Sequence, residues 1–72
     1  MLMAIRNRLK TIRHELQINY QADMARMLGI SQYQYNRYER QRAQPTLEVA
    51  LRIARKLNLP VEYIFYLDGD PE

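Results

Sequence analysis

Residues 21–38 read QADMARMLGISQYQYNRY, and this stretch decides the fold. Apolar residues recur at helical spacing as far as Leu28, and Gly29 then interrupts the pattern. Glycine accepts the positive φ that ends a helix, and Ser31 can accept a hydrogen bond from the free amides of a following helix. The pattern therefore predicts a helix-turn-helix, two short helices joined by a tight turn.

The second of these helices, expected from Gln32 to Arg40, has two faces. Ala25 in the first helix is small enough to let the second helix cross close by. Tyr35 and Tyr38 are expected to pack inward, although the hydroxyl of a packed tyrosine can still reach a phosphate. The outer face is polar and consists of Gln32, Tyr33, Asn36, Arg37 and Arg40.

From about Arg8 to Phe65 the sequence resembles the Cro/repressor (XRE-like) family of helix-turn-helix DNA-binding proteins. The small alanine, the turn glycine, the flanking apolar residues and the following YERQRAQPT segment all occur in the family's order. The resemblance implies an all-α fold, a compact five-helix repressor-like domain with a central helix-turn-helix. It also implies a largely buried, structural ion pair between Arg13 and Glu39. The residues assigned structural roles are Ala25, Gly29, Ser31, Arg13 and Glu39.

Length and charge limit the class of protein. Seventy-two residues make one domain, expected over residues 1–67, with a short acidic tail at residues 68–72. Residues 1–42 contain eight Lys or Arg against three acids, whereas residues 43–72 contain three against five. The helix-turn-helix half is therefore the basic half, and a polyanion would meet a positive face.

The chain offers little for catalysis or for metal binding. It has one serine, one histidine and no cysteine, and its carboxylates are scattered over different predicted helices. We therefore expect no enzyme activity, no cofactor and no metal. No apolar run approaches the ~18 residues that a membrane span needs, and the N-terminus lacks a signal-peptide stretch. The expected location is the cytoplasm, without a membrane partner.

The other apolar residues predict three further helices. The first runs from about residue 4 to residue 16, with an apolar core stripe of Ile5, Leu9, Ile12 and Leu16. Asn19 is expected to cap the helix that follows. Thr46 can cap a fourth helix, which Asn58 ends and whose apolar face is Leu47, Ala50, Leu51, Ile53, Ala54 and Leu57. Pro60 suits the start of a short fifth helix.

An apolar cluster closes the sequence. It comprises Tyr63, Phe65, Tyr66 and Leu67 and is too apolar for a frayed end. It either closes the core or forms part of a dimer contact.

The pattern and the resemblance together predict a sequence-specific double-stranded DNA-binding transcriptional regulator, a repressor, whose helix from about Gln32 to Arg40 lies in the major groove. Arg37 can donate to guanine N7 and O6, and Gln32 can pair with adenine. The expected base-reading residues are Gln32, Tyr33, Gln34 and Arg37. The expected phosphate contacts are Gln21, Asn36, Arg40, Arg42 and Gln44.

The expected partner is a palindromic duplex operator, read by a homodimer whose half-sites lie about one helical turn apart, ~34 Å. The alternative is a protein-interaction module on the same scaffold, such as an antitoxin with a toxin as its partner. The outer face of the second helix argues against this alternative, because it is rich in donors and poor in apolar anchors. A repressor is the leading expectation, with an activator and an antitoxin as the alternatives.

Overall fold

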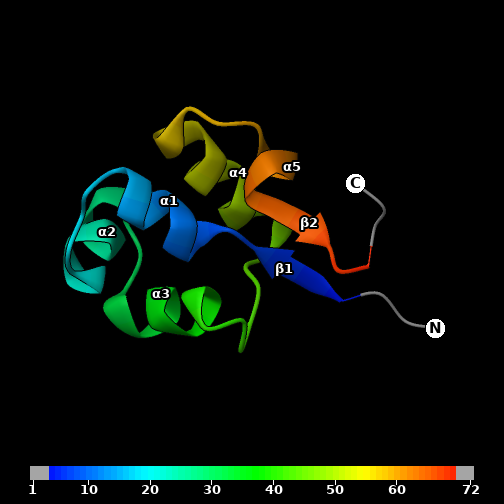
Figure 1. Cartoon of the computed structure of the whole chain (residues 1–72), viewed down its shortest axis with the longest axis horizontal. Helices are drawn as coiled ribbons and strands as arrows, with labels where there is room; N and C mark the ends of the chain where they lie inside the picture. The colour runs from blue at the N-terminus through cyan, green and yellow to red at the C-terminus, as the bar shows by residue number, and fades with distance from the viewer. Residues whose placement is uncertain (1–3, 70–72) are drawn as a thin grey trace.

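The computed structural model describes residues 4–69. In chain order, the elements are β1 (Ile5–Asn7), α1 (Leu9–Glu15), α2 (Gln21–Leu28), α3 (Gln32–Glu39), α4 (Leu47–Leu57), α5 (Val61–Ile64) and β2 (Phe65–Leu67). The helices form one body, and the paired strands extend from one end of its long axis (Figure 1). Residues 70–72 of the expected acidic tail lie outside the described residues.

The core lies between the helices, and every helix contributes at least one buried side chain. It is formed by Leu9, Ile12, Met24, Ala25, Leu28, Tyr35, Tyr38, Ile53, Ala54 and Ile64. Tyr35 is wholly buried and Tyr38 nearly so, which fits the inward packing expected of both rings. Across residues 4–69, no helix has both the length and the apolar character needed to cross a membrane.

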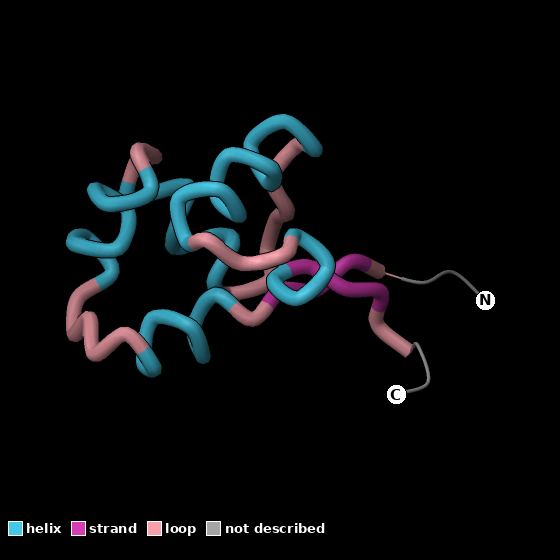
Figure 2. The backbone as a smooth tube through the Cα atoms, turned by 90° about the horizontal axis from the view of Figure 1, so that it is seen from above, coloured by secondary structure: helices cyan, strands magenta, loops and turns pink. Residues whose placement is uncertain are grey.

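The five-helix architecture is confirmed, but the chain also contains a small antiparallel sheet of β1 and β2, drawn as the magenta parts of the tube in Figure 2. Ile5 pairs with Leu67 and Asn7 with Phe65. The expectation that the first helix begins near residue 4 is therefore wrong. The Asn7 Oδ1 accepts a hydrogen bond from the Leu9 amide at 3.1 Å, so the helix begins at Leu9 and the preceding residues are free to pair with β2.

The apolar stripe of the first helix is only half core. Leu9 and Ile12 are buried, but Ile5 is 51% exposed because it lies in β1, and Leu16 is 49% exposed. Leu16 lies where α1 ends, and the next residue, Gln17, takes the left-handed conformation (φ 60°) that glycine often supplies. The helix thus ends within one residue of the expected position, and Leu16 lies at its exposed end.

The ends of the later helices follow the expected capping chemistry. Thr46 Oγ1 accepts a hydrogen bond from the Val49 amide at 3.3 Å at the start of α4. Asn58 ends that helix in the left-handed conformation, and Pro60 precedes α5. The expected cap at Asn19 is wrong, because Tyr20 occupies the cap position of α2 and makes no side-chain cap bond.

The apolar face of α4 is wider than the surface that covers it. Ala50, Ile53 and Ala54 are buried against the other helices. Leu47 and Leu51, which belong to the apolar face expected from the sequence, are 72% and 51% exposed. The neighbouring elements therefore cover only part of that face, and helical period alone does not say how far they extend over it.

The C-terminal cluster divides between different environments. Phe65 packs against the core, whereas Leu67 is 43% exposed at the end of β2. The Arg8 guanidinium lies 4.4 Å from the centre of the Tyr66 ring and 5.4 Å from that of Tyr63. Part of the cluster thus closes the fold, and part of it faces solvent.

Candidate nucleic-acid interface

The turn between α2 and α3 is formed by backbone hydrogen bonds and one side chain. Gly29 ends α2 with φ 74°, and the Ile30 amide returns to the Ala25 carbonyl at 3.0 Å. Ala25 is buried, so the two helices meet closely at this point. Ser31 Oγ accepts a hydrogen bond from the Gln34 amide at 3.1 Å and so caps α3. These contacts set the direction in which α3 leaves the turn.

The outward face of α3 presents polar side chains to solvent. Gln32, Tyr33 and Gln34 are exposed, and Arg37 is half-buried. Tyr33 is 70% exposed, and the Arg37 guanidinium carbon lies 5.8 Å from the centre of its ring. This is a weak cation–π contact between side chains one turn apart. The Arg37 guanidinium, which carries several N–H donors, therefore lies beside the exposed Tyr33 ring.

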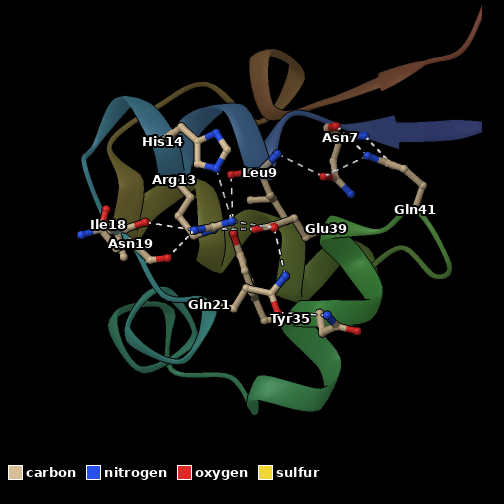
Figure 3. A network of polar contacts seen from close by, with 11 residues as sticks. Asn7, Leu9, Arg13, His14, Ile18, Asn19, Gln21, Tyr35, Glu39 and Gln41 are labelled. Atoms are coloured by element: carbon tan, nitrogen blue, oxygen red, sulfur yellow. Dashed lines mark hydrogen bonds and ion pairs between the residues drawn. The ribbon is translucent and has the colours of Figure 1, made fainter.

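A buried ion pair joins the end of α3 to α1. Arg13 Nε lies 2.9 Å from Glu39 Oε2, and Arg13 Nη2 lies 3.0 Å from Glu39 Oε1 (Figure 3). The two side chains are 9% and 3% exposed. Arg13 Nη1 also donates to the carbonyls of Ile18 and Asn19, at 3.0 and 3.2 Å. The arginine therefore connects α1, the following link and α3, and the bidentate geometry fixes their relative positions.

The Glu39 carboxylate is linked by hydrogen bonds to Gln21 and, through Gln21, to Asn36, which are two of the expected phosphate contacts. Gln21 Nε2, at the start of α2, donates to Glu39 Oε1 at 3.0 Å. Asn36 Nδ2, on α3, donates in turn to Gln21 Oε1 at 2.9 Å. Gln21 and Asn36 are thus oriented by the ion pair, and each still has an amide N–H beyond the one used here. The chain of bonds also brings the first amides of α2 beside α3, where the helix dipole favours an anion.

The electrostatics of the pair follow from its burial and its hydrogen bonds. Burial by itself would raise the pKa of Glu39, but the hydrogen bond from Arg13 opposes it, and the net pKa lies below the ordinary value. The hydrogen bond to Glu39 raises the pKa of Arg13. Both groups are therefore ionised at neutral pH, with their charges neutralised by each other.

A second polar network holds the loop after α3. Asn7 is 4% exposed, and its Nδ2 donates to the Tyr38 carbonyl at 2.8 Å and to Gln44 Oε1 at 2.9 Å. Gln41 takes a left-handed conformation (φ 60°), and its side-chain amide pairs with the backbone N–H and C=O of Asn7, at 3.1 and 2.9 Å. Gln44 Nε2 donates to Gln41 Oε1 at 3.1 Å. The side chain of Gln44 is therefore engaged within the protein, in addition to any contact that it makes outside.

Sequence reasoning missed Asn7 and Gln41. An asparagine can accept a hydrogen bond from the backbone amide two residues on, and this local turn signal before the apolar period could have identified Asn7. No local signal identifies Gln41, because its partner lies in β1. The remaining expected phosphate contacts, Arg40 and Arg42, are exposed beside this network.

A family model described as "Helix-turn-helix" (HTH_3) matches residues 2–64. The chain belongs to this helix-turn-helix family. A crystal structure of the P22 c2 repressor protein, in complex with synthetic operator 9T in the presence of Tl⁺, is similar to it, with 30% sequence identity and a TM-score of 0.70. The match covers 88% of this chain and 91% of that one. No curated protein matches the sequence.

The resemblance drawn from the sequence is thus confirmed for this helix-turn-helix protein, and the repressor-like fold with it. Most of the expected contact residues gather on one side of α3 and at its two ends. Gln32, Tyr33, Gln34 and Arg37 belong to α3 itself. Gln21 reaches this side from α2 through Asn36, and the basic and amide side chains after Glu39 extend it along the loop.

Removal of one partner of the buried ion pair should destabilise the fold strongly. Glu39→Ala leaves the Arg13 charge buried without its partner, and we expect the free energy of unfolding to fall by about 3–5 kcal/mol. Denaturant unfolding measures this loss. Glu48→Ala is the matched control, because Glu48 pairs with Arg52 at the surface, where both side chains are at least 70% exposed, and it should change stability little. A loss for Glu39→Ala no larger than that of the control would contradict the structural role.

The lowered pKa of Glu39 also sets the response to acid. Its ionisation contributes fully to stability above the unfolded value of about 4.3, and this contribution is lost as the pH falls through the lower pKa of the folded state. Below about pH 4, the unfolding free energy of the native protein should therefore fall more steeply with acidification than that of Glu39→Gln. Denaturant unfolding over a series of acidic buffers gives both slopes. Parallel slopes would show that Glu39 is not the group responsible.

Proposed function

We propose that this protein is a sequence-specific double-stranded DNA-binding transcriptional regulator, acting as a repressor, with α3 lying in the major groove. The observation that carries the proposal is the outward face of α3, which is donor-rich, exposed and held in place by buried contacts on its other side. The major groove admits one α-helix, and base edges there present acceptors and donors that side chains can distinguish. The solved structure of the similar P22 c2 repressor contains operator DNA, which supports the same partner here.

Within this proposal, the contact residues on and beside α3 form two groups: base-reading residues, and phosphate-binding residues, here called anchors. Arg37 would donate to guanine N7 and O6, and Gln32 would pair with adenine, with Tyr33 and Gln34 contacting neighbouring bases. The contact between Arg37 and Tyr33 limits the guanidinium to fewer orientations, which lowers the entropy lost on binding. A pre-oriented arginine discriminates more sharply than a freely rotating one.

The anchors would be Asn36, which lies on α3, and four residues beside this helix: Gln21, Arg40, Arg42 and Gln44. Gln21 and Asn36 are already oriented by the Glu39 carboxylate, so they need not reorganise to meet a phosphate. Arg40 and Arg42 are exposed and can follow the backbone as flexible cations. Phosphate contacts of this kind fix the register of a protein on the duplex without reading its sequence.

The operator would be palindromic, and two copies of the chain would read its half-sites. One α3 contacts only a few base pairs, and a two-fold dimer doubles the site while keeping its half-sites about one helical turn apart. The proposed function requires no catalytic group, and it agrees with the location in the cytoplasm expected from the sequence.

A second candidate, a protein-interaction module such as an antitoxin, would use another face. An apolar hollow of about 350 Å³ lies between α1 and the α4–α5 turn, lined by Ile12, Glu15, Leu16, Leu57, Leu59, Pro60 and Tyr63. A toxin bound there would leave the α3 face free. An antitoxin that also binds DNA would satisfy both readings, so the two candidates differ in whether α3 is needed.

Substitution of two arginines separates reading from anchoring. Arg37→Ala should relax base preference at one position of a selected duplex, at a cost of about 1–3 kcal/mol for the preferred base pair. Arg42→Ala should weaken binding to all sequences alike and reduce the slope of log affinity against log salt by about 1. Competition assays over single-base variants of the duplex measure both effects.

Arg55→Ala is the matched control for these two variants, since it removes the same charge from an exposed position on α4. It should leave both the preference profile and the salt slope nearly unchanged. An unaltered preference profile for Arg37→Ala would show that α3 does not read the bases as proposed.

A further inference from the structure

The side chain of Gln41 joins the loop after α3 to the outer edge of β1. Neighbouring residues of a strand direct their backbone groups to opposite edges. The Arg8 N–H donates to the Ile64 carbonyl at 2.9 Å, so the backbone groups of Asn7 face away from β2. There the Gln41 side-chain amide accepts from the Asn7 N–H at 3.1 Å and donates to the Asn7 carbonyl at 2.9 Å (Figure 3). These two hydrogen bonds, here called the amide clamp, take the place of one residue of a third strand.

The backbone of the same loop closes the end of α3. The Gln41 N–H donates to the Tyr38 carbonyl at 3.0 Å, and the Arg42 N–H donates to the Arg37 carbonyl at 2.9 Å. These two bonds form a Schellman motif, in which the residue after the helix is left-handed. Gln41 has φ 60°, a conformation in which the Cβ of an L residue is crowded. Support for this conformation comes from outside the loop, through the amide clamp.

Asn7 is a rigid base for the clamp because its side chain is also bonded. It is 4% exposed, and its Oδ1 accepts from the Leu9 amide at 3.1 Å. Its Nδ2 donates to the Tyr38 carbonyl at 2.8 Å and to Gln44 Oε1 at 2.9 Å. The clamp therefore refers the loop to β1, to the start of α1 and to the end of α3 at once.

We propose that Gln41 is a positioning residue for Arg42: the clamp holds the turn so that the exposed Arg42 starts from one place beside α3 and meets a DNA phosphate. The arginine side chain is long and flexible, so the position of its Cα decides which region the guanidinium reaches. Rotation of Gln41 to a negative φ would redirect the chain and break the bond from Arg42 to Arg37. The inference rests on the proposed function and deepens it, because it assigns part of the DNA affinity to a residue that acts through another.

The clamp supports a different part of the protein from the Arg13–Glu39 pair. That pair is buried and orients α3 itself, whereas Gln41 is half-buried and lies outside the apolar core. A loop that is ordered before binding loses less conformational entropy when it meets its partner. Loss of the clamp should therefore lower DNA affinity through Arg42 and leave the reading of bases by α3 unchanged.

The test replaces Gln41 by glycine, which accepts the left-handed conformation but has no side-chain amide. Gln17→Gly is the matched control, because Gln17 is exposed and has the same φ of 60° after α1. Thermal unfolding of the full chain establishes that both variants fold. In the free protein, hydrogen exchange at the Arg42 amide should become about tenfold faster in Gln41→Gly and stay within about twofold in the control. Unchanged exchange at Arg42 in Gln41→Gly would overturn the inference.

Binding to a duplex selected from a random pool tests the functional part. Gln41→Gly should bind about five- to tenfold more weakly than the native chain, with the same base preferences, and the control within about twofold. In an Arg42→Ala background, adding Gln41→Gly should change the affinity by less than about twofold, because the cation that the clamp positions is then absent. An equal loss in both backgrounds would indicate a merely structural role and would overturn the inference.

A second substitution tests the link between the clamp and the left-handed turn. Gln41→Ala lacks the amide and also disfavours a positive φ, so it should bind the duplex more weakly than Gln41→Gly. Native-like binding by Gln41→Ala and Gln41→Gly would overturn the inference while the proposed function stands. Absence of any duplex binding by the native chain would refute the proposed function, and this inference with it.

Discussion

The buried ion pair between Arg13 and Glu39 is the interaction on which the rest of the structure depends. It joins α1 to the last residue of α3, and Arg13 also holds the link between α1 and α2. Removing two charges from water is costly, so the net stabilisation from such a pair is small. Its main effect is to hold two helices in one relative position. Here it fixes the angle at which α3 leaves the core, so the outward face of α3 has one defined position.

The polar residues around α3 consequently fall into two kinds. Gln21 and Asn36 are tied to Glu39, and their remaining N–H groups point from fixed places. Arg40 and Arg42 carry charge at exposed positions. A surface that combines pre-oriented amides with exposed cations loses little entropy at the amides on meeting a rigid polyanion. The buried pair thus gives the amides of Gln21 and Asn36 their orientation.

Local chemistry explains which features the sequence predicts. Gly29, Ser31, Thr46 and Asn58 act on neighbouring amides and carbonyls, so their roles follow from adjacent residues alone. The pairing of Arg13 with Glu39 came from family resemblance, because nothing local links two helices so far apart in sequence. For the candidate site, the outward residues of α3 could be named in advance, but not the bonds that orient them.

The features that the sequence missed all depend on distant partners. The strands β1 and β2 come from opposite ends of the chain, and neither has the length or alternation that marks a strand. Gln41 occupies a position where glycine would serve the backbone, and its amide bonds to Asn7 explain why a side chain is kept there. The exposure of Leu47 could not be foreseen either, since it depends on where the neighbouring elements end.

In the proposed function, α3 and the start of α2 form the DNA-binding surface. Backbone amide resonances of the protein, followed by NMR during titration with a duplex selected from a random pool, test this claim most directly. The largest shifts should fall on residues 32–37 and on Gln21, with smaller changes along the loop after Glu39. Shifts centred instead on the hollow between α1 and the α4–α5 turn, with α3 unaffected, would contradict it.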